Sequence, residues 1–329
     1  MKSKNYEVVI WGEPSLDTVV IPLEEEKLDS RNSAEIVEDI GGSGANTASN
    51  ISLLGISTLL LGSIGSDSTG IKISEELNKR NIDSLLSKVN TNRRTVSIAR
   101  PDGTRTMYGT TSDQYTSVLD LDHEIQEIAA QMFHVSLTSI LRSNHFHILK
   151  TVKYFQSQGA IISLDAGNDL EIEKSERVLD TLFQEIQPDI LFANHDEVIA
   201  LRSSNVDLNQ FPVIVVKRGI KGCDLLQRGS ITKEIPVPVE IRAIDTTGAG
   251  DAFASGMLAG LLSGLDLSSS ATLGHLVAGA CIQTVGSSIR DPELLVSARN
   301  FLLAFKEVQR VPLFETLHSK TELQQQKYQ

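Results

Sequence analysis

The sequence contains few cysteines and no long apolar run. The two cysteines, Cys223 and Cys281, lack the spacing of metal-binding pairs, so we expect them to be buried thiols. No stretch of about 18 apolar residues occurs, so no membrane-spanning helix is expected. The first residues lead straight into an apolar strand without the apolar core of a signal peptide, so a cytoplasmic location is expected.

Basic residues are also scarce relative to acidic ones. The chain has 30 Lys and Arg against 42 Asp and Glu, which gives a net charge of −12 and a pI of about 5.1. A chain with this balance lacks the basic face that binding to nucleic acid or an anionic membrane requires, so neither partner is expected. ATP binding remains open, because local donors and a bound metal set the field of a site.

Short apolar runs alternate with helical patterns along most of the 329 residues. This alternation predicts an α/β fold with a mainly parallel sheet covered on both faces. We expect strands at 6–11, 59–64, 132–137, 160–164, 190–193 and 213–217, and helices at 47–54, 68–80, 144–158, 175–184, 249–262, 267–285 and 292–307.

Two stretches depart from the alternation. Segments 18–22 and 35–40 flank a charged connector, and segments 96–100 and 104–109 flank Pro101-Asp-Gly103, a hairpin signal. They predict a small sheet, built from about residues 13–40 and 94–113, that projects from the core. We expect one domain over residues 1–312 and a polar, frayed tail over 313–329.

The most informative segment is Asp-Thr-Thr-Gly-Ala-Gly-Asp at residues 245–251, directly before an apolar helical stretch. The small residues Gly248, Ala249 and Gly250 let the backbone approach a ligand, and the helix start offers N–H groups and partial positive charge to a phosphate. Asp251 would repel a phosphate but can take a proton from a hydroxyl that attacks phosphorus. The segment therefore indicates phosphoryl transfer. The structural alternative is a glycine-capped turn whose Asp favours the helix dipole.

A second glycine-rich segment, Gly41-Gly-Ser-Gly-Ala-Asn46, precedes another small-residue helix. Paired glycines allow close backbone approach, and the Asn46 amide both donates and accepts, so it can read a polyol hydroxyl. A flexible loop before a tightly packed helix is the alternative.

These motifs resemble those of the PfkB (ribokinase-like) carbohydrate kinase family. Its motif Gly-Gly-x-x-x-Asn-x-Ala is matched by Gly41, Gly42, Asn46 and Ala48, and its motif Asp-Thr-x-Gly-Ala-Gly-Asp-x-Phe by residues 245–253. The resemblance implies a ribokinase-like three-layer α/β/α sandwich with a small β-sheet lid, and an ATP-dependent carbohydrate kinase. It also implies a homodimer formed through the lid.

The resemblance implies a substrate side and a catalytic base. Asp17, five residues after a glycine, matches the substrate-binding Asp, whose carboxylate can accept from two sugar hydroxyls. A solvated turn Asp is the alternative. Arg105 matches a lid Arg near the substrate, although a surface Arg fits the hairpin equally well, and segment 109–113 should touch the pocket. Gly41, Gly42 and Asn46 would complete the sugar site, and Asp251 would be the general base.

The resemblance also implies a nucleotide side. Asn194 and Glu197 match the Asn-x-x-Glu element that orders Mg²⁺ largely through water, and an N-terminal helix cap is compatible with that role. Lys217, Gly219 and Gly222 match the nucleotide site, with a basic surface turn as the alternative. His275 lies on the helix that flanks the adenine pocket in relatives, but it also fits a packed helical histidine.

Some relatives bind K⁺ through backbone carbonyls that match Asp245 and Thr247. The partner loop that matches residues 286–288 is short here, which argues against K⁺ activation. Two other functions remain open. A nucleoside kinase of the same fold is suggested by Arg105-Thr-Met107, which resembles runs in nucleoside-binding relatives. A catalytically silent sugar sensor is less favoured, because Gly248, Asp251 and Glu197 are intact.

Overall fold

The computed structural model describes residues 4–100, 105–110, 124–142 and 145–305. Within them, nine strands form one sheet, and all neighbours are parallel except near one edge, where one strand runs antiparallel to both of its neighbours. The mainly parallel sheet is therefore confirmed. Its spatial order is β13 (Ser230–Ile235), β12 (Cys223–Gln227), β11 (Val213–Lys217), β10 (Ile190–Asn194), β9 (Ile161–Asp165), β8 (Ile128–Ser136), β1 (Lys4–Trp11), β4 (Thr58–Gly65) and β5 (Asp83–Val89).

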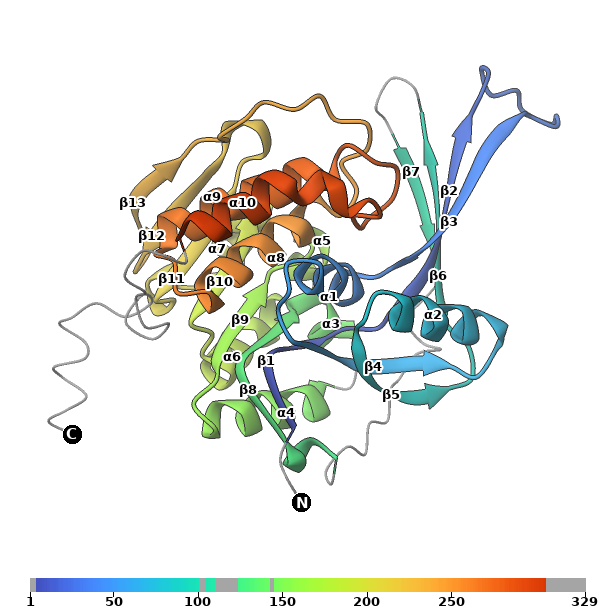
Figure 1. The fold of residues 1–329 in the computed structure, drawn as a ribbon. Helices are drawn as coiled ribbons and strands as arrows, with labels where there is room; N and C mark the ends of the chain where they lie inside the picture. The colour runs from blue at the N-terminus through green and yellow to red at the C-terminus, as the bar shows by residue number, and fades with distance from the viewer. Residues whose placement is uncertain (1–3, 101–104, 111–123, 143–144, 306–329) are drawn as a thin grey trace, which may run out of the picture.

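Helices cover both faces of this sheet (Figure 1). Side chains alternate along a strand, so Val8 and Ile10 of β1 enter one hydrophobic core while Val9 and Trp11 enter the other. The three-layer α/β/α arrangement is thus confirmed. The first core packs against α1 (Ser43–Ser52), α2 (Ser68–Lys79), α8 (Ala249–Leu262), α9 (Leu267–Cys281) and α10 (Val296–Phe305). The second packs against α3 (Leu137–Arg142), α4 (His145–Ser157), α5 (Asp169–Lys174), α6 (Glu176–Ile186) and α7 (His195–Ser203).

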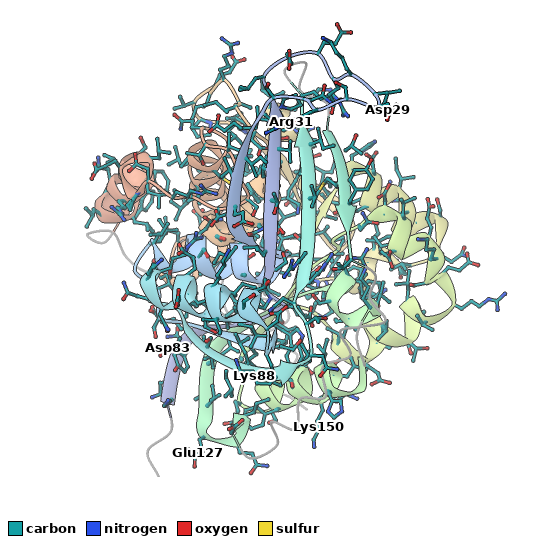
Figure 2. The ribbon with its side chains drawn as sticks, turned by 90° about the vertical axis from the view of Figure 1, so that its right-hand side faces the viewer. Asp29, Arg31, Asp83, Lys88, Glu127 and Lys150 are labelled. Atoms are coloured by element: carbon teal, nitrogen blue, oxygen red, sulfur yellow. The ribbon has the colours of Figure 1, made fainter. Side chains whose placement is uncertain are left out.

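A second sheet, four-stranded in the described residues, projects from the core and is called the lid (Figure 1). Its order is β3 (Ala34–Gly41), β2 (Ser15–Pro22), β6 (Arg93–Ala99) and β7 (Arg105–Gly109). Asp29 and Arg31 lie at the end of the lid far from the core (Figure 2). Since β2 follows β1 and β3 leads into α1, the base of the lid lies at the carboxyl end of β1. The predicted projecting sheet is confirmed. The predicted turn at 101–103 and the tail at 313–329 lie outside the described residues.

The boundaries differ from the prediction in several places. The edge strands β5 and β13, and β12 beside β13, were not predicted, because they carry few buried apolar residues or follow a turn closely. The helix expected at 47–54 begins earlier, at Ser43, so Asn46 is helical rather than part of a loop. The helix expected at 267–285 ends at Cys281. The carbonyl of Ile282 accepts from the N–H groups of Ile244 and Asp245 instead of continuing the helix. The segment expected at 292–307 starts as a 3₁₀ turn, η5 (Pro292–Leu295).

Two expectations from composition can be compared with the structure. Cys223 and Cys281 are free and buried, as predicted. In the described part of the chain, no helix has the length and apolar character needed to cross a membrane.

Candidate functional site

Helix α8 begins at a turn that requires glycine. Gly248 has φ +73°, and a Cβ placed there would lie 2.0 Å from the carbonyl oxygen of Ser287. A side chain would therefore clash with the segment that follows α9. The N–H of Ala249, predicted to face a phosphate, donates to the carbonyl of Thr246 at 3.3 Å. Gly250 and Asp251 follow in the first turn, where helical N–H groups have no partner within the helix.

Asp251 is held by two side chains from α1. Its Oδ1 accepts a hydrogen bond from Ser43 Oγ at 2.6 Å, and its Oδ2 accepts one from Asn46 Nδ2 at 2.8 Å. Asn46 is fixed in turn, because its Oδ1 accepts from Ser287 Oγ at 2.9 Å. The two glycine-rich segments, far apart in the sequence, therefore meet at the start of α8.

The environment of Asp251 raises its pKa to about 6. Burial is the main cause, and the negative charge of Asp165 adds to it. The hydrogen bonds from Ser43 and Asn46 and the charge of Lys217 act in the opposite direction. The carboxylate is thus ionised at neutral pH and more basic than an ordinary aspartate, which suits a general base.

Lys217 points toward the same helix start. Its Nζ lies 2.8 Å from Oδ2 of Asp165 and would be 3.4 Å from a Cβ placed on Gly250. Burial alone would lower the pKa of Lys217, but the charges of Asp165, Glu197 and Asp251 raise it above its usual value. The site therefore holds a half-buried, charged lysine beside the first turn of α8.

Glu197 lies in the first turn of α7, and Asn194 caps that helix. Asn194 Oδ1 accepts from the Glu197 N–H at 2.9 Å, and the two Glu197 oxygens accept from Asn194 N and Nδ2, each at 2.8 Å. Burial and the charge of Asp165 raise the pKa of Glu197 to about 7. The capping arrangement expected from the sequence is therefore present.

The residues Asp17, Gly41 and Gly42, predicted for the substrate side, lie at the base of the lid. Asp17 Oδ1 accepts from Ser15 Oγ at 2.7 Å, and a Cβ on Gly41 would lie 1.9 Å from Asp17 Oδ2. Gly42 caps α1 with φ +92°. Burial raises the pKa of Asp17, although hydrogen bonds from Ser15 and Thr95 oppose the rise. Asp17, Gly41 and Gly42 thus lie together, and α1 connects them to Asp251.

Comparison with known proteins identifies the family of this chain. The model of the family described as pfkB family carbohydrate kinase matches residues 7–294. The chain belongs to this family. A protein of Pyrococcus horikoshii described as a sugar kinase is 28% identical over 267 residues, which cover 78% of this chain and 85% of the relative.

Solved structures of other kinases have the same fold. An adenosine kinase from Sinorhizobium meliloti superposes with a TM-score of 0.74 at 20% identity, covering 90% of this chain and 99% of the other. An Arabidopsis thaliana ribokinase, solved with ribose and ATP, gives a TM-score of 0.70 at 21% identity, covering 91% and 99%. The predicted ribokinase-like fold is confirmed.

The other residues predicted for the nucleotide site of this pfkB family member are Gly219, Gly222 and His275. Gly219 starts a 3₁₀ turn, η4 (Gly219–Lys221), and Gly222 packs so closely that a Cβ would lie 2.0 Å from the Ile235 carbonyl oxygen. The Ile235 backbone also hydrogen-bonds His275. Burial lowers the pKa of His275 to about 4, so its ring is neutral. The ring packs edge-on against that of Phe253, with 4.9 Å between the two ring centroids. A packed histidine accounts for these contacts, and a role toward adenine stays a prediction.

The lid residues predicted to touch substrate are described only in part. The backbone of Arg105 pairs with Ala99 in the lid, but its side chain lies outside the described residues. Of segment 109–113, only Gly109 and Thr110 are described, and Thr110 bonds to the backbone of Arg94. The roles of Arg105 and this segment therefore stay predictions.

Sequence reasoning missed three residues that organise the site: Ser43, Asp165 and Ser287. Asp165 comes directly after the strand predicted at 160–164, and ligands bind beyond the carboxyl ends of such strands, so it could have been found. Ser43 and Ser287 carry no such signal, because their partners are 208 and 241 residues away in the chain. His134 is also buried beneath this cluster, with Nδ1 2.9 Å from Ser163 Oγ.

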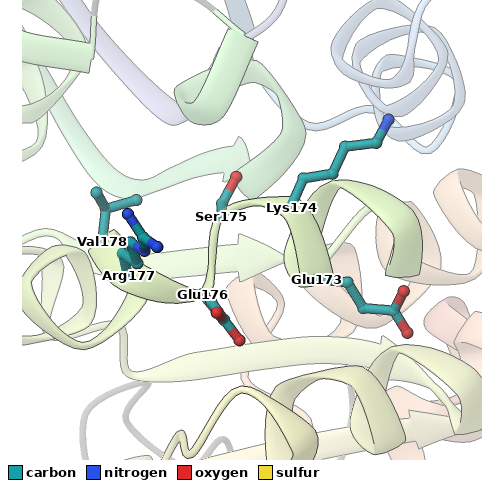
Figure 3. A pocket seen from close by; sticks show the side chains of 6 residues that line it. All are labelled: Glu173, Lys174, Ser175, Glu176, Arg177 and Val178. Atoms are coloured by element: carbon teal, nitrogen blue, oxygen red, sulfur yellow. The ribbon is translucent and has the colours of Figure 1, made fainter.

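A separate surface hollow of about 510 Å³ lies where α5 meets α6 (Figure 3). It is lined by residues 173–178, which include none of the predicted site residues. Glu173 and Lys174 extend in different directions there (Figure 3). This hollow is distinct from the start of α8 and is not part of the candidate site.

Proposed function

We propose that this chain transfers the γ-phosphoryl group of ATP to a hydroxyl of a small sugar or sugar-like alcohol, with Asp251 as general base. One observation carries the proposal: a carboxylate whose pKa is raised to about 6 stands in the first turn of α8, directly after a glycine turn. A phosphate-binding turn alone would not need that carboxylate. A kinase needs it to accept the proton of the attacking alcohol.

The chemistry assigned to each residue follows from its place. The substrate oxygen attacks the γ-phosphorus, the bond to the bridging oxygen of ADP breaks, and Asp251 takes the hydroxyl proton. The Gly250 and Asp251 N–H groups, the helix start and Lys217 stabilise the charge on the phosphoryl oxygens. Asp17, Gly41, Gly42 and Asn46 orient the sugar. Asn46 also orients Asp251 through the hydrogen bond from its Nδ2, which supports a position for Asn46 between the sugar and the proposed base.

The donor set fits Mg²⁺ bound chiefly by phosphates and water. Among the described residues, no three His, Cys, Asp or Glu side chains gather into a metal site, and Mg²⁺ needs few protein ligands. Both Glu197 oxygens already accept from Asn194, an arrangement that is compatible with a Glu197 that would hold Mg²⁺ through water. When bound, the ion would neutralise phosphate charge. The backbone carbonyls of Asp245 and Thr247 remain the proposed K⁺ ligands, and we assign no step to that ion.

The lid supports the proposed homodimer. By strand register, Ile36, Val96 and Tyr108 lie on one face of the lid, where they leave 64%, 38% and 61% of their surface exposed. Apolar side chains gathered on one projecting sheet suit a contact with a second copy. Light scattering on the purified chain measures its mass in solution and tests this contact.

The deciding experiment measures ADP release with Mg-ATP against pentoses, hexoses, sugar acids and nucleosides, with and without K⁺. We expect turnover on one sugar. The panel includes nucleosides because a solved adenosine kinase shares the fold and because Arg105-Thr-Met107 resembles runs of nucleoside-binding relatives.

Asp251→Asn should lower kcat by roughly 100-fold or more with little change in substrate binding, since a general base contributes at least that much. Asp180→Asn, an exposed α6 position, is the matched control and should keep wild-type activity. Near-normal turnover of Asp251→Asn would contradict the assigned base. Ligand binding without any turnover in the wild type would favour the silent sensor.

A further inference from the structure

The hydroxyl of Ser43 donates a hydrogen bond to one carboxylate oxygen of the proposed base, Asp251. Its Oγ donates to Asp251 Oδ1 at 2.6 Å, and this is its one hydrogen bond to another described residue. The second donor to Asp251 is fixed differently, because Asn46 is buried and held at its other end by Ser287. Ser43 is therefore the donor that a single side-chain rotation can release.

The hydroxyl is not needed to build α1. Gly42, not Ser43, is the N-cap residue of that helix, and no side chain caps it. At the other end of the same helix, Ser52 Oγ donates to the backbone carbonyls of Ser49 and Arg80, as helical serines commonly do. Ser43 instead donates to a carboxylate, and a charged acceptor makes this the stronger kind of hydrogen bond.

An alcohol that donates to the base is the contact that the substrate must make before reaction. We propose that the Ser43 hydroxyl is an internal stand-in for the substrate alcohol, which keeps water off Asp251 until a sugar displaces it. This inference rests on the proposed kinase function, because it assigns Ser43 a role only if Asp251 is the base.

The stand-in would prevent a wasteful reaction. A water molecule that donates to Asp251 beside bound ATP can attack the γ-phosphorus. Its oxygen then forms the new bond to phosphorus, the bond to the bridging oxygen of ADP breaks, and Asp251 takes the proton. Asp251 is half-buried, so an oxygen freed from Ser43 is open to water before the sugar arrives. With Ser43 in place, that position is filled by an alcohol attached to the chain.

The test is ADP release from Mg-ATP without any sugar. Ser43→Ala should raise this rate about tenfold or more over the wild type, because general base catalysis is worth at least 100-fold once water can reach the base. Ser43→Thr keeps a hydroxyl and should stay near the wild-type rate. Ser52→Ala is the matched serine on α1 and should also stay there. Adding Asp251→Asn to Ser43→Ala should remove the gain, which links it to the base.

Three outcomes would overturn the inference. If Ser43→Ala phosphorylates the sugar but shows no rise in sugar-free ADP release, Ser43 does not exclude water, and the proposed function stands. If mass spectrometry finds a phosphoryl group on Ser43 after incubation with Mg-ATP alone, the hydroxyl is itself an acceptor and not a stand-in. If the wild type turns over no substrate of the panel, the proposed function fails and the inference falls with it.

Discussion

At the scale of single residues, Asp251 must be ionised and yet basic. Burial and the charge of Asp165 push the pKa up, while Ser43, Asn46 and Lys217 push it down, and the balance is about 6. The folded pKa lies above the ordinary value of 3.8, so ionisation of Asp251 opposes folding. Its contribution to stability is fully present below pH 3.8 and is lost as the pH rises through about 6. The site thus gives up some stability at neutral pH to keep a reactive base.

The raised pKa predicts how activity depends on pH. Below pH 6 the ionised fraction of Asp251 decreases, and well below that pH it decreases about tenfold for each pH unit. The value of kcat/KM for the sugar should decrease in the same way. The measurement is kcat/KM from pH 4.5 to 8.5, roughly the range over which such a base titrates, at saturating Mg-ATP. A profile that stays flat down to pH 5 would show that no group with this pKa is required.

Glu197 needs its own control, since its pKa is about 7 and it titrates in the same range. The carboxylate whose charge raises the pKa of Asp251 is that of Asp165. Glu197→Gln should therefore lower the rate but leave the acid limb near pH 6. If the limb disappears in that variant, Glu197 is the group that titrates.

At the scale of elements, the site depends on three parallel strands that end together. Asn194 pairs with Lys217 across β10 and β11, and Asp165 ends the neighbouring strand β9. The carboxyl ends of parallel strands meet at one edge of a sheet. The helix that starts directly after β10 then brings Glu197 to the same edge. An ion pair between Lys217 and Asp165 joins the outer two of these strand ends.

This pair predicts a stability cost for Lys217→Met. The side chains of Lys217 and Asp165 are only 15% and 9% exposed, so the variant leaves a buried carboxylate without its cation. We expect a loss of about 3–5 kcal/mol in the free energy of unfolding. Asp165→Asn combined with Lys217→Met removes both charges and should lose less than the two single losses added. Urea denaturation of all four proteins gives the coupling, and strict additivity would mean that the pair is not a unit.

The strands and motifs of the site could be predicted from the sequence because their signals are local. Residues 245–253 form a continuous motif, and the end of each buried strand can be predicted from the point where its apolar run stops. The contacts between segments could not be predicted, because one sequence does not say which strand ends and loops are neighbours. Ser43 is the clearest case: it stands inside a predicted motif, but its role depends on Asp251, 208 residues away. The predicted end of helix α9 was too late for a similar reason. The N–H of Ile244, which is distant in the sequence, donates to the carbonyl of Ile282.

At the scale of the whole molecule, a buried carboxylate of the lid, Asp39, is among the contacts that join the lid to the core. Asp39, near the end of β3, accepts from Arg80 at 2.7 Å and from Arg290 at 2.9 Å. Its Oδ2 also accepts from Ser288 Oγ at 3.3 Å. Ser288 adjoins Ser287, whose carbonyl packs against Gly248 and whose hydroxyl holds Asn46. A displacement of the lid base therefore reaches the turn before α8 through a continuous set of contacts.

The neighbouring carboxylate on the same strand provides a matched comparison. Glu38 pairs with Lys72 at 3.4 Å, and these side chains are 50% and 61% exposed. Asp39 is 7% exposed and Arg80 is 12% exposed. Asp39→Asn should lower the free energy of unfolding by about 1.5–3 kcal/mol, the value of buried hydrogen bonds to charged groups. Glu38→Gln should cost less than about 1 kcal/mol, as exposed pairs do.

The two variants should also differ in catalysis. The base of the lid carries Asp17, so a loosened β3 should raise KM for the sugar in Asp39→Asn, whereas Glu38→Gln should keep the wild-type KM. Salt screens the interactions of exposed charged side chains, so the KM values of the two variants should be compared at physiological ionic strength. Equal effects of the two substitutions on KM would show that the lid is positioned by its strands alone. A larger effect of Asp39→Asn would mean that this buried carboxylate couples the sugar side to the turn that holds the base.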